Sequence, residues 1–90
     1  MLIARVVGNV TATRKAERLD GLRFLLLQPH AAPPEKTGAE RENTLLAAVD
    51  LLGAGPGDDV LVAVGRAARL AVGGEDVPID AAVVGIVDRL

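Results

Sequence analysis

The sequence predicts a mainly β domain in which five short strands close into a barrel with one short helix beside it. Three observations predict this class. Five segments carry the alternation or β-branched composition of strands, only one carries helical spacing, and 90 residues suffice for one domain, over residues 1–90. Half of the residues are apolar but only one is aromatic, so we expect a core of Val, Leu, Ile and Ala.

The first strand is expected from Leu2 to Ala12, where even-numbered positions are apolar or small and most odd-numbered positions are polar. Alternation with period two indicates a strand with one buried face. Gly8 lies in the middle of this segment and predicts a bend or a bulge. Residues 13–21 are polar and end in Asp20-Gly21, which is a turn signal.

The second strand is expected over residues 22–28, where a run of three leucines, 25–27, asks for burial on both faces. Two interpretations remain open for this run. It indicates either a contact between subunits or a single leucine exposed at the surface, which is common in proteins. Residues 29–43 are rich in proline and predict a surface loop, in which His30 is a solvated histidine.

Three further strands are expected over residues 44–49, 59–64 and 81–87, and a short helix over residues 65–72. The helix carries apolar residues at i, i+3 and i+4 spacing, which are Ala67, Leu70 and Ala71. Five short strands favour a closed barrel, because closure removes exposed strand edges. The expected fold is all-β and OB-like, with its helix after the fourth strand instead of the third.

Composition argues against several classes of protein. The net charge is −2 and basic residues are not in excess, which argues against binding to a nucleic-acid backbone. A single aromatic residue provides no stacking platform for bases. No apolar run reaches the roughly 20 residues of a membrane helix, and the first five residues do not resemble a secretory signal. We therefore expect a cytoplasmic protein that binds neither nucleic acid nor membrane.

The residues needed for catalysis and metal binding are scarce. The chain has no cysteine and no serine, and its one histidine lies in the proline-rich segment, so thiolate metal sites and a Ser-His-Asp triad are ruled out. The adjacent acids Asp58-Asp59 and Glu75-Asp76 fall in predicted turns, where carboxylates are usually solvated. The expectation is a protein that is not an enzyme and has no metal and no cofactor.

The segment "GAGPGDD", residues 53–59, invites comparison with phosphate-binding loops. Such loops place their glycines between a strand and a helix. Here a strand follows, Pro56 lacks an amide proton, and Asp58 and Asp59 would repel a phosphate. The favoured interpretation is a rigid, side-chain-free turn for subunit packing, in which the acids cap the turn or face solvent.

Three segments in order, "ARVVGNVTATRKAERLDGLRFLLLQP", "LLGAGPGDDVLVAVGRAAR" and "PIDAAVVGIVD", resemble the EutN/CcmL family over residues 1–88. Members of that family are pentameric vertex proteins of bacterial microcompartment and carboxysome shells. The resemblance implies an OB-like barrel that assembles as a cyclic homopentamer and caps the five-fold vertices of a polyhedral shell in the cytoplasm. Its implied partners are hexameric and pseudohexameric shell proteins.

The resemblance also suggests site residues. It implies that Gly65, Arg66 and Ala67 lie near the five-fold axis, beside a narrow pore. Many relatives carry a small polar residue in place of Arg66, so two orientations stay open. If Arg66 points at the axis, five copies favour anions, and otherwise it faces solvent or pairs with an acid.

We expect the subunit interface to include Asp50, Gly53, Gly55, Arg69 and Asp80, with an ion pair between Arg69 and a carboxylate of the neighbour. One alternative function is an OB-like module that binds a small ligand or a nucleic acid. It predicts a monomer with a basic or aromatic face. A second alternative is a small non-catalytic enzyme subunit, which predicts co-purification with a larger chain.

Overall fold

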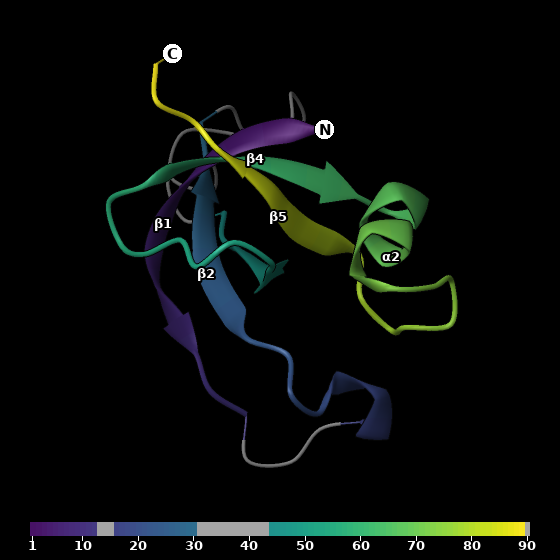
Figure 1. The fold of residues 1–90 in the computed structure, drawn as a ribbon. Coiled ribbons are helices and arrows are strands. Elements are labelled where there is room, and N and C mark those ends of the chain that lie inside the picture. The colour runs from purple at the N-terminus through teal and green to yellow at the C-terminus, as the bar shows by residue number, and fades with distance from the viewer. Residues whose placement is uncertain (13–15, 31–43, 90) are drawn as a thin grey trace.

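The five strands form a closed barrel (Figure 1). The computed structural model describes residues 1–12, 16–30 and 44–89. Within them the elements are β1 (Leu2–Val10), a short 3₁₀ turn η1 (Glu17–Leu19), β2 (Phe24–Pro29), β3 (Leu46–Asp50), β4 (Asp59–Val64), α2 (Arg66–Val72) and β5 (Ala81–Ile86). Around the barrel the order is β1-β2-β3-β5-β4. Only the β3–β5 pair is parallel. The predicted fold class and the position of the helix are confirmed.

The barrel interior is filled by small and branched aliphatic side chains. This inner cluster consists of Ala4, Val6, Leu25, Leu27, Ala48, Ala54, Val60, Val62, Ala81 and Val83. Alternate residues of each strand point inward, so the period-two pattern of the sequence produces this core directly. The leucine run divides in the same way, because Leu25 and Leu27 are fully buried while Leu26 is half-buried on the outer face.

A bulge in β1 changes which residues face inward. Val6 lies opposite Leu27, but Gly8 lies opposite Leu26, so one residue of β1 is unpaired between them. Residues directly opposite each other in an antiparallel pair share a face. Gly8 is therefore on the outer face of the barrel. The predicted alternation in exposure nevertheless continues to Val10, because Gly8 and Val10 are half-buried while Val7 and Asn9 are exposed, and it ends before Ala12, which is exposed. The prediction of a bulge at Gly8 is confirmed.

A second cluster lies outside the barrel, under α2. Its fully buried members are Val49, Ala63, Ala68 and Ala82, and the half-buried residues packed against them are Leu22, Phe24, Val72, Ile79 and Val84. The helix contributes Ala68 and Val72 to this cluster. The face with the predicted apolar spacing, Ala67, Leu70 and Ala71, instead points to solvent in the isolated subunit. The helix is thus apolar on its inner and its outer side.

The predicted strand ends differ from the observed ones by at most two residues, and both ends of β4 match. The predicted loop over residues 29–43 begins one residue later than expected, because Pro29 closes β2. The rest of that predicted loop, from residue 31, lies outside the described residues. No helix in the described part of the chain is long and apolar enough to span a membrane.

Candidate subunit interface

The loop after β3 is organised by one carboxylate. Asp50 Oδ1 accepts hydrogen bonds from the backbone N–H groups of Leu52 at 3.1 Å, Gly53 at 3.1 Å and Ala54 at 3.3 Å. Its Oδ2 lies 3.2 Å from the Arg23 guanidinium, and the Asp50 side chain is 1% exposed. Arg23 also donates to the carbonyl of Ala54 at 3.2 Å. Arg23 and Asp50 therefore hold the loop against the start of β2.

The far end of this loop is held by a second carboxylate and by β1. Asp58 Oδ2 accepts the N–H of Gly55 at 2.9 Å, so Asp58 caps the turn as the sequence led us to expect. The N–H of Gly57 donates to the carbonyl of Val6 at 2.9 Å, and the N–H of Val6 donates to the carbonyl of Asp58 at 2.9 Å. Ala54 points into the inner cluster and is fully buried. Residues 53–57, called the glycine loop below, are thus fixed on both sides.

The glycines of this loop have two different explanations. Gly53 has φ of 81° and Gly57 has φ of 93°, which is the left-handed region that favours glycine. Gly55 has no positive φ, and a Cβ atom at this position would have no neighbour within 4 Å among the described residues. The isolated subunit therefore gives no reason for glycine at position 55.

The loop amides are not available to a phosphate. The N–H groups of Leu52, Gly53, Ala54 and Gly55 all donate to the carboxylates of Asp50 and Asp58. A phosphate-binding loop needs such donors free and directed at the ligand. The geometry agrees with the structural interpretation of "GAGPGDD" and disfavours a nucleotide site.

The other predicted site residues gather around α2. Gly65, with φ of 62°, precedes the helix and donates its N–H to the carbonyl of Asp80 at 2.7 Å. Arg66 is 72% exposed and forms an ion pair with Glu75 of the same chain. Arg69 and Asp80 line an open hollow of about 590 Å³ that also includes residues 75–79. Within the described part of the chain, neither the Arg69 guanidinium nor the Asp80 carboxylate has a side-chain partner.

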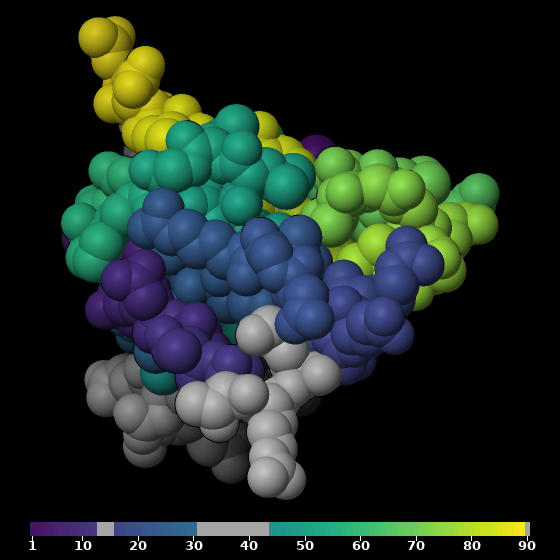
Figure 2. All heavy atoms as spheres, turned by 60° about the horizontal axis from the view of Figure 1, so that its bottom comes forward, coloured from purple at the N-terminus to yellow at the C-terminus, as the bar shows by residue number. Residues whose placement is uncertain are grey.

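The predicted interface residues therefore form two groups. Asp50, Gly53 and Gly55 lie in or beside the glycine loop, whereas Arg69 and Asp80 lie beside α2. The glycine loop reaches to the side of the barrel opposite α2 (Figure 1). In Figure 2 the teal segment that contains the loop spans the left and the centre of the view, and the green α2 region lies at the right. Sequence reasoning missed Arg23, because only the fold brings it to Asp50 and no local motif links the two residues.

A separate polar cluster lies where β4 begins. Arg5 binds Asp59 with Nε at 3.1 Å and with Nη2 at 3.2 Å, and His30 Nε2 lies 2.8 Å from Asp59 Oδ1. The hydrogen bond from Arg5, followed by that from His30, holds the pKa of Asp59 below its ordinary value. The predicted solvated histidine is exposed, but it is anchored to the barrel through this carboxylate.

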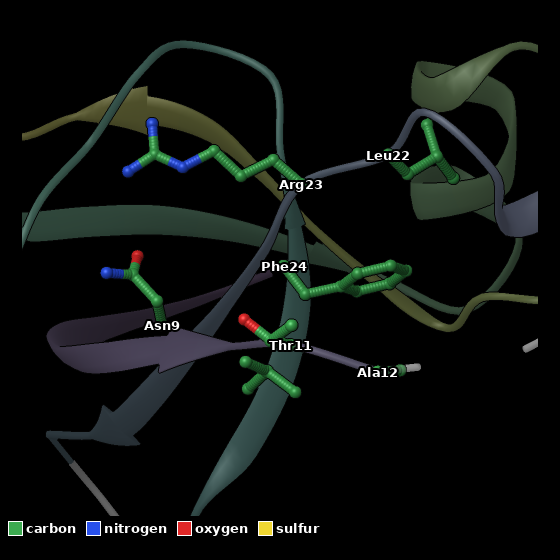
Figure 3. Close-up of a pocket in the computed structure, with 7 residues that line it drawn as sticks. Asn9, Thr11, Ala12, Leu22, Arg23 and Phe24 are labelled. Carbon is green, nitrogen blue, oxygen red and sulfur yellow. The ribbon is translucent and has the colours of Figure 1, made fainter. Parts of the chain in front are cut away.

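Another hollow, about 420 Å³, lies at the loop end of the β1–β2 hairpin (Figure 3). Its lining residues are Asn9, Val10, Thr11, Ala12, Leu22, Arg23 and Phe24. The side chains of Asn9 and Arg23 lie on one side of the view and that of Phe24 on the other (Figure 3). Among the described residues of this lining, Arg23 alone is ionisable, and it already binds Asp50. The described residues contain no group of three or more His, Cys, Asp or Glu side chains placed to hold a metal.

Comparison with known proteins identifies the family. The family described as "Ethanolamine utilisation protein EutN/carboxysome" matches residues 1–88. The carboxysome shell vertex protein CcmL of Thermosynechococcus vestitus is 46% identical over 90 residues, which is all of this chain and 86% of the relative.

Two solved structures also resemble the barrel. The pentameric microcompartment shell protein GrpN from Rhodospirillum rubrum superposes with a TM-score of 0.77 at 35% identity, covering 100% of this chain and 96% of that one. CcmL of Gloeobacter violaceus gives a TM-score of 0.80 at 37% identity, covering 100% of this chain and 88% of that one. The chain therefore belongs to the EutN/CcmL family of microcompartment and carboxysome shell vertex proteins.

Proposed function

We propose that five copies of this chain close into a ring that caps the five-fold vertices of a polyhedral microcompartment shell, and that its role there is structural and not catalytic. The observation that carries the proposal is the pair of different exposed flanks, the glycine loop and α2, on opposite sides of one barrel. A closed ring uses head-to-tail contacts between two different surfaces of each subunit. The solved pentamer of GrpN supports a ring of five.

The role follows from the geometry of closed shells. A flat sheet of six-fold tiles cannot close, and a five-fold ring in place of one tile introduces the curvature that closure requires. The partners of the ring are then the edges of hexameric and pseudohexameric shell proteins. The site of action is the shell itself, inside the cytoplasm.

The polar part of the subunit seam includes Arg69, Asp80 and the Asp50 end of the glycine loop. Arg69 is half-buried, and within the described residues it has no acid partner, so a carboxylate of the neighbouring subunit is its proposed partner. Arg69→Ala is expected to lower the fraction of pentamer in native mass spectrometry at low concentration. Arg18→Ala removes the exposed pair with Asp76 and serves as a control that leaves the pentamer intact. Equal pentamer fractions for the two variants would exclude the pair.

The proposed opening of the ring is bordered by Gly65, Arg66 and Ala67. Because Arg66 pairs with Glu75 of its own chain, the charge that each subunit brings to the opening is largely balanced. We therefore expect Arg66→Ala to leave the conductance of chloride unchanged and Glu75→Ala to raise it, by freeing five guanidinium groups. A fall in chloride conductance for Arg66→Ala would instead assign an unpaired Arg66 to the pore.

Solution mass tests the proposed function directly. The subunit is 9.3 kDa, and sedimentation or native mass spectrometry is expected to give five times this mass. The ring is also expected to occupy the corners of shells when it is co-expressed with hexameric shell proteins. A stable, folded monomer that is absent from shell corners would overturn the proposal and favour an OB-like binding module.

A further inference from the structure

We infer that the apolar centre of the subunit seam is made by Leu70 on α2 of one subunit, which seats on the bare backbone of the glycine loop at Gly55 of the next subunit. This inference rests on the proposed ring and specifies which two surfaces meet in it. It also adds Leu70, which sequence reasoning did not place in the interface. Three independent features of the subunit lead to it.

The first feature is the outer face of α2. The helix has only seven residues and is too short to be stable without packing. Its inner side packs in the outer cluster through Ala68 and Val72. Its outer side carries the exposed Ala67, Leu70 and Ala71, and Leu70 is 55% exposed. A helix that is apolar on both sides is typical of a buried helix, so the outer side of α2 lacks a cover in the isolated subunit.

The second feature is the surface of the glycine loop. Gly55 has no positive φ, and none of the described residues occupies the space where its side chain would lie, so these residues do not explain why position 55 lacks a side chain. The loop is nevertheless rigid, because Asp50 and Asp58 bind its amides from both ends. Leu51 and Leu52, at 41% and 49% exposure, make the start of this surface apolar. A rigid, bare and partly apolar surface loses little conformational freedom when a leucine is placed on it.

The third feature is the placement of the two surfaces. The glycine loop lies on the side of the barrel away from α2, so the two surfaces do not meet within one subunit (Figure 1). The two surfaces differ in shape, because the outer side of α2 projects the Leu70 side chain and the glycine loop has no side chain at Gly55. Contacts between unlike surfaces propagate head to tail and close as a ring, whereas a two-fold dimer would bring like surfaces together. In the proposed ring, the outer side of α2 is therefore covered by one neighbouring copy of the chain, and the glycine loop is covered by the neighbouring copy on the other side.

Disulfide trapping tests the contact, because the chain contains no cysteine of its own. The double variant Gly55→Cys with Leu70→Cys is oxidised with diamide and analysed on a non-reducing denaturing gel. We expect a ladder from monomer to covalent pentamer, which dithiothreitol collapses to monomer. Each single variant is expected to remain monomeric on the gel, and an equal mixture of the two is expected to give dimers and nothing larger.

The outcomes separate this inference from the proposed ring. A native pentamer whose double variant forms no ladder would overturn the Leu70–Gly55 contact while the ring stands. A dimer from Leu70→Cys alone would also overturn it, because that product requires like surfaces to meet. A native monomer would instead refute the ring itself.

A pair of charge substitutions gives a second readout. Leu70→Glu is expected to lower the fraction of pentamer at least ten-fold at micromolar concentration, with the circular dichroism of the subunit retained. Leu45→Glu is the matched control, because Leu45 is 50% exposed and lies outside α2 and the glycine loop. Equal loss of pentamer in both variants would contradict the assignment to Leu70.

Discussion

The two flanks of the barrel differ in how complete they are in the isolated subunit. At the glycine loop, two carboxylates bind four backbone amides, and Arg23 closes the network. At α2, Leu70 is exposed, and in the described part of the chain Arg69 and Asp80 have no side-chain partners. The loop therefore acquires its shape from its own chain, while the helix flank offers groups that a neighbouring subunit can satisfy.

The largest effect is expected for Asp50→Ala. The substitution removes the acceptor of three amides and the partner of Arg23, at a side chain that is almost fully buried. Losing these bonds is expected to lower the free energy of unfolding by about 3 kcal/mol. Asp50→Asn keeps one acceptor oxygen and is expected to lose about half as much. Denaturant unfolding at one fixed subunit concentration measures both, because unfolding of an oligomer depends on concentration.

The outcome for Asp50→Ala decides whether the loop is built by its own chain. A free energy of unfolding within about 0.5 kcal/mol of the wild type, the range of an ordinary surface substitution, would mean that the loop does not depend on this network. The neighbouring subunit would then have to shape the loop, and the contrast between the two flanks would disappear.

An intermediate effect on the free energy of unfolding is expected at α2, where Ala→Leu substitutions are compared on the buried and the exposed side of the helix. Ala68 is fully buried in the outer cluster, so Ala68→Leu is expected to lower the free energy of unfolding by about 1–3 kcal/mol through overpacking. Ala71 is exposed, so Ala71→Leu is expected to change the free energy of unfolding of the dissociated subunit, measured at a concentration below that of ring formation, by no more than about 0.5 kcal/mol, and to act on the stability of the ring. Circular dichroism measures the first quantity and native mass spectrometry the second.

The sequence predicts the elements of both flanks but not their contacts. Alternation in β1 and the glycines and acids around residue 55 are local signals, and they correctly predict a strand, a bulge and a capped turn. The sequence around α2 does not determine which side of the helix is buried, because Ala68 and Leu70 have equally apolar neighbours in the sequence. Only the outer surface of β3, β4 and β5 selects Ala68 for burial. The Arg23–Asp50 pair likewise depends on the pairing of β2 with β3.

The smallest effect is expected at Asp59, which follows the glycine loop and is more open than Asp50. Arg5 and His30 lower the pKa of Asp59 in the folded protein, so this carboxylate stabilises the fold above its unfolded pKa of about 3.9. That contribution is lost as the pH falls through the lower, folded pKa. The difference in melting temperature between wild type and Asp59→Asn is therefore expected to be small at pH 6 and to shrink as the pH falls below about 3.9.

Added salt is expected to affect the contributions of Asp50 and Asp59 to stability differently. The Arg5–Asp59 pair is exposed to solvent, so 1 M salt, with a Debye length of about 3 Å, is expected to remove most of the effect of Asp59→Asn at pH 6. The effect of Asp50→Ala should persist in the same salt, because it arises from hydrogen bonds to a buried carboxylate. If salt abolished both effects equally, the Asp50 network would be a surface ion pair, and the loop would owe its rigidity to the ring.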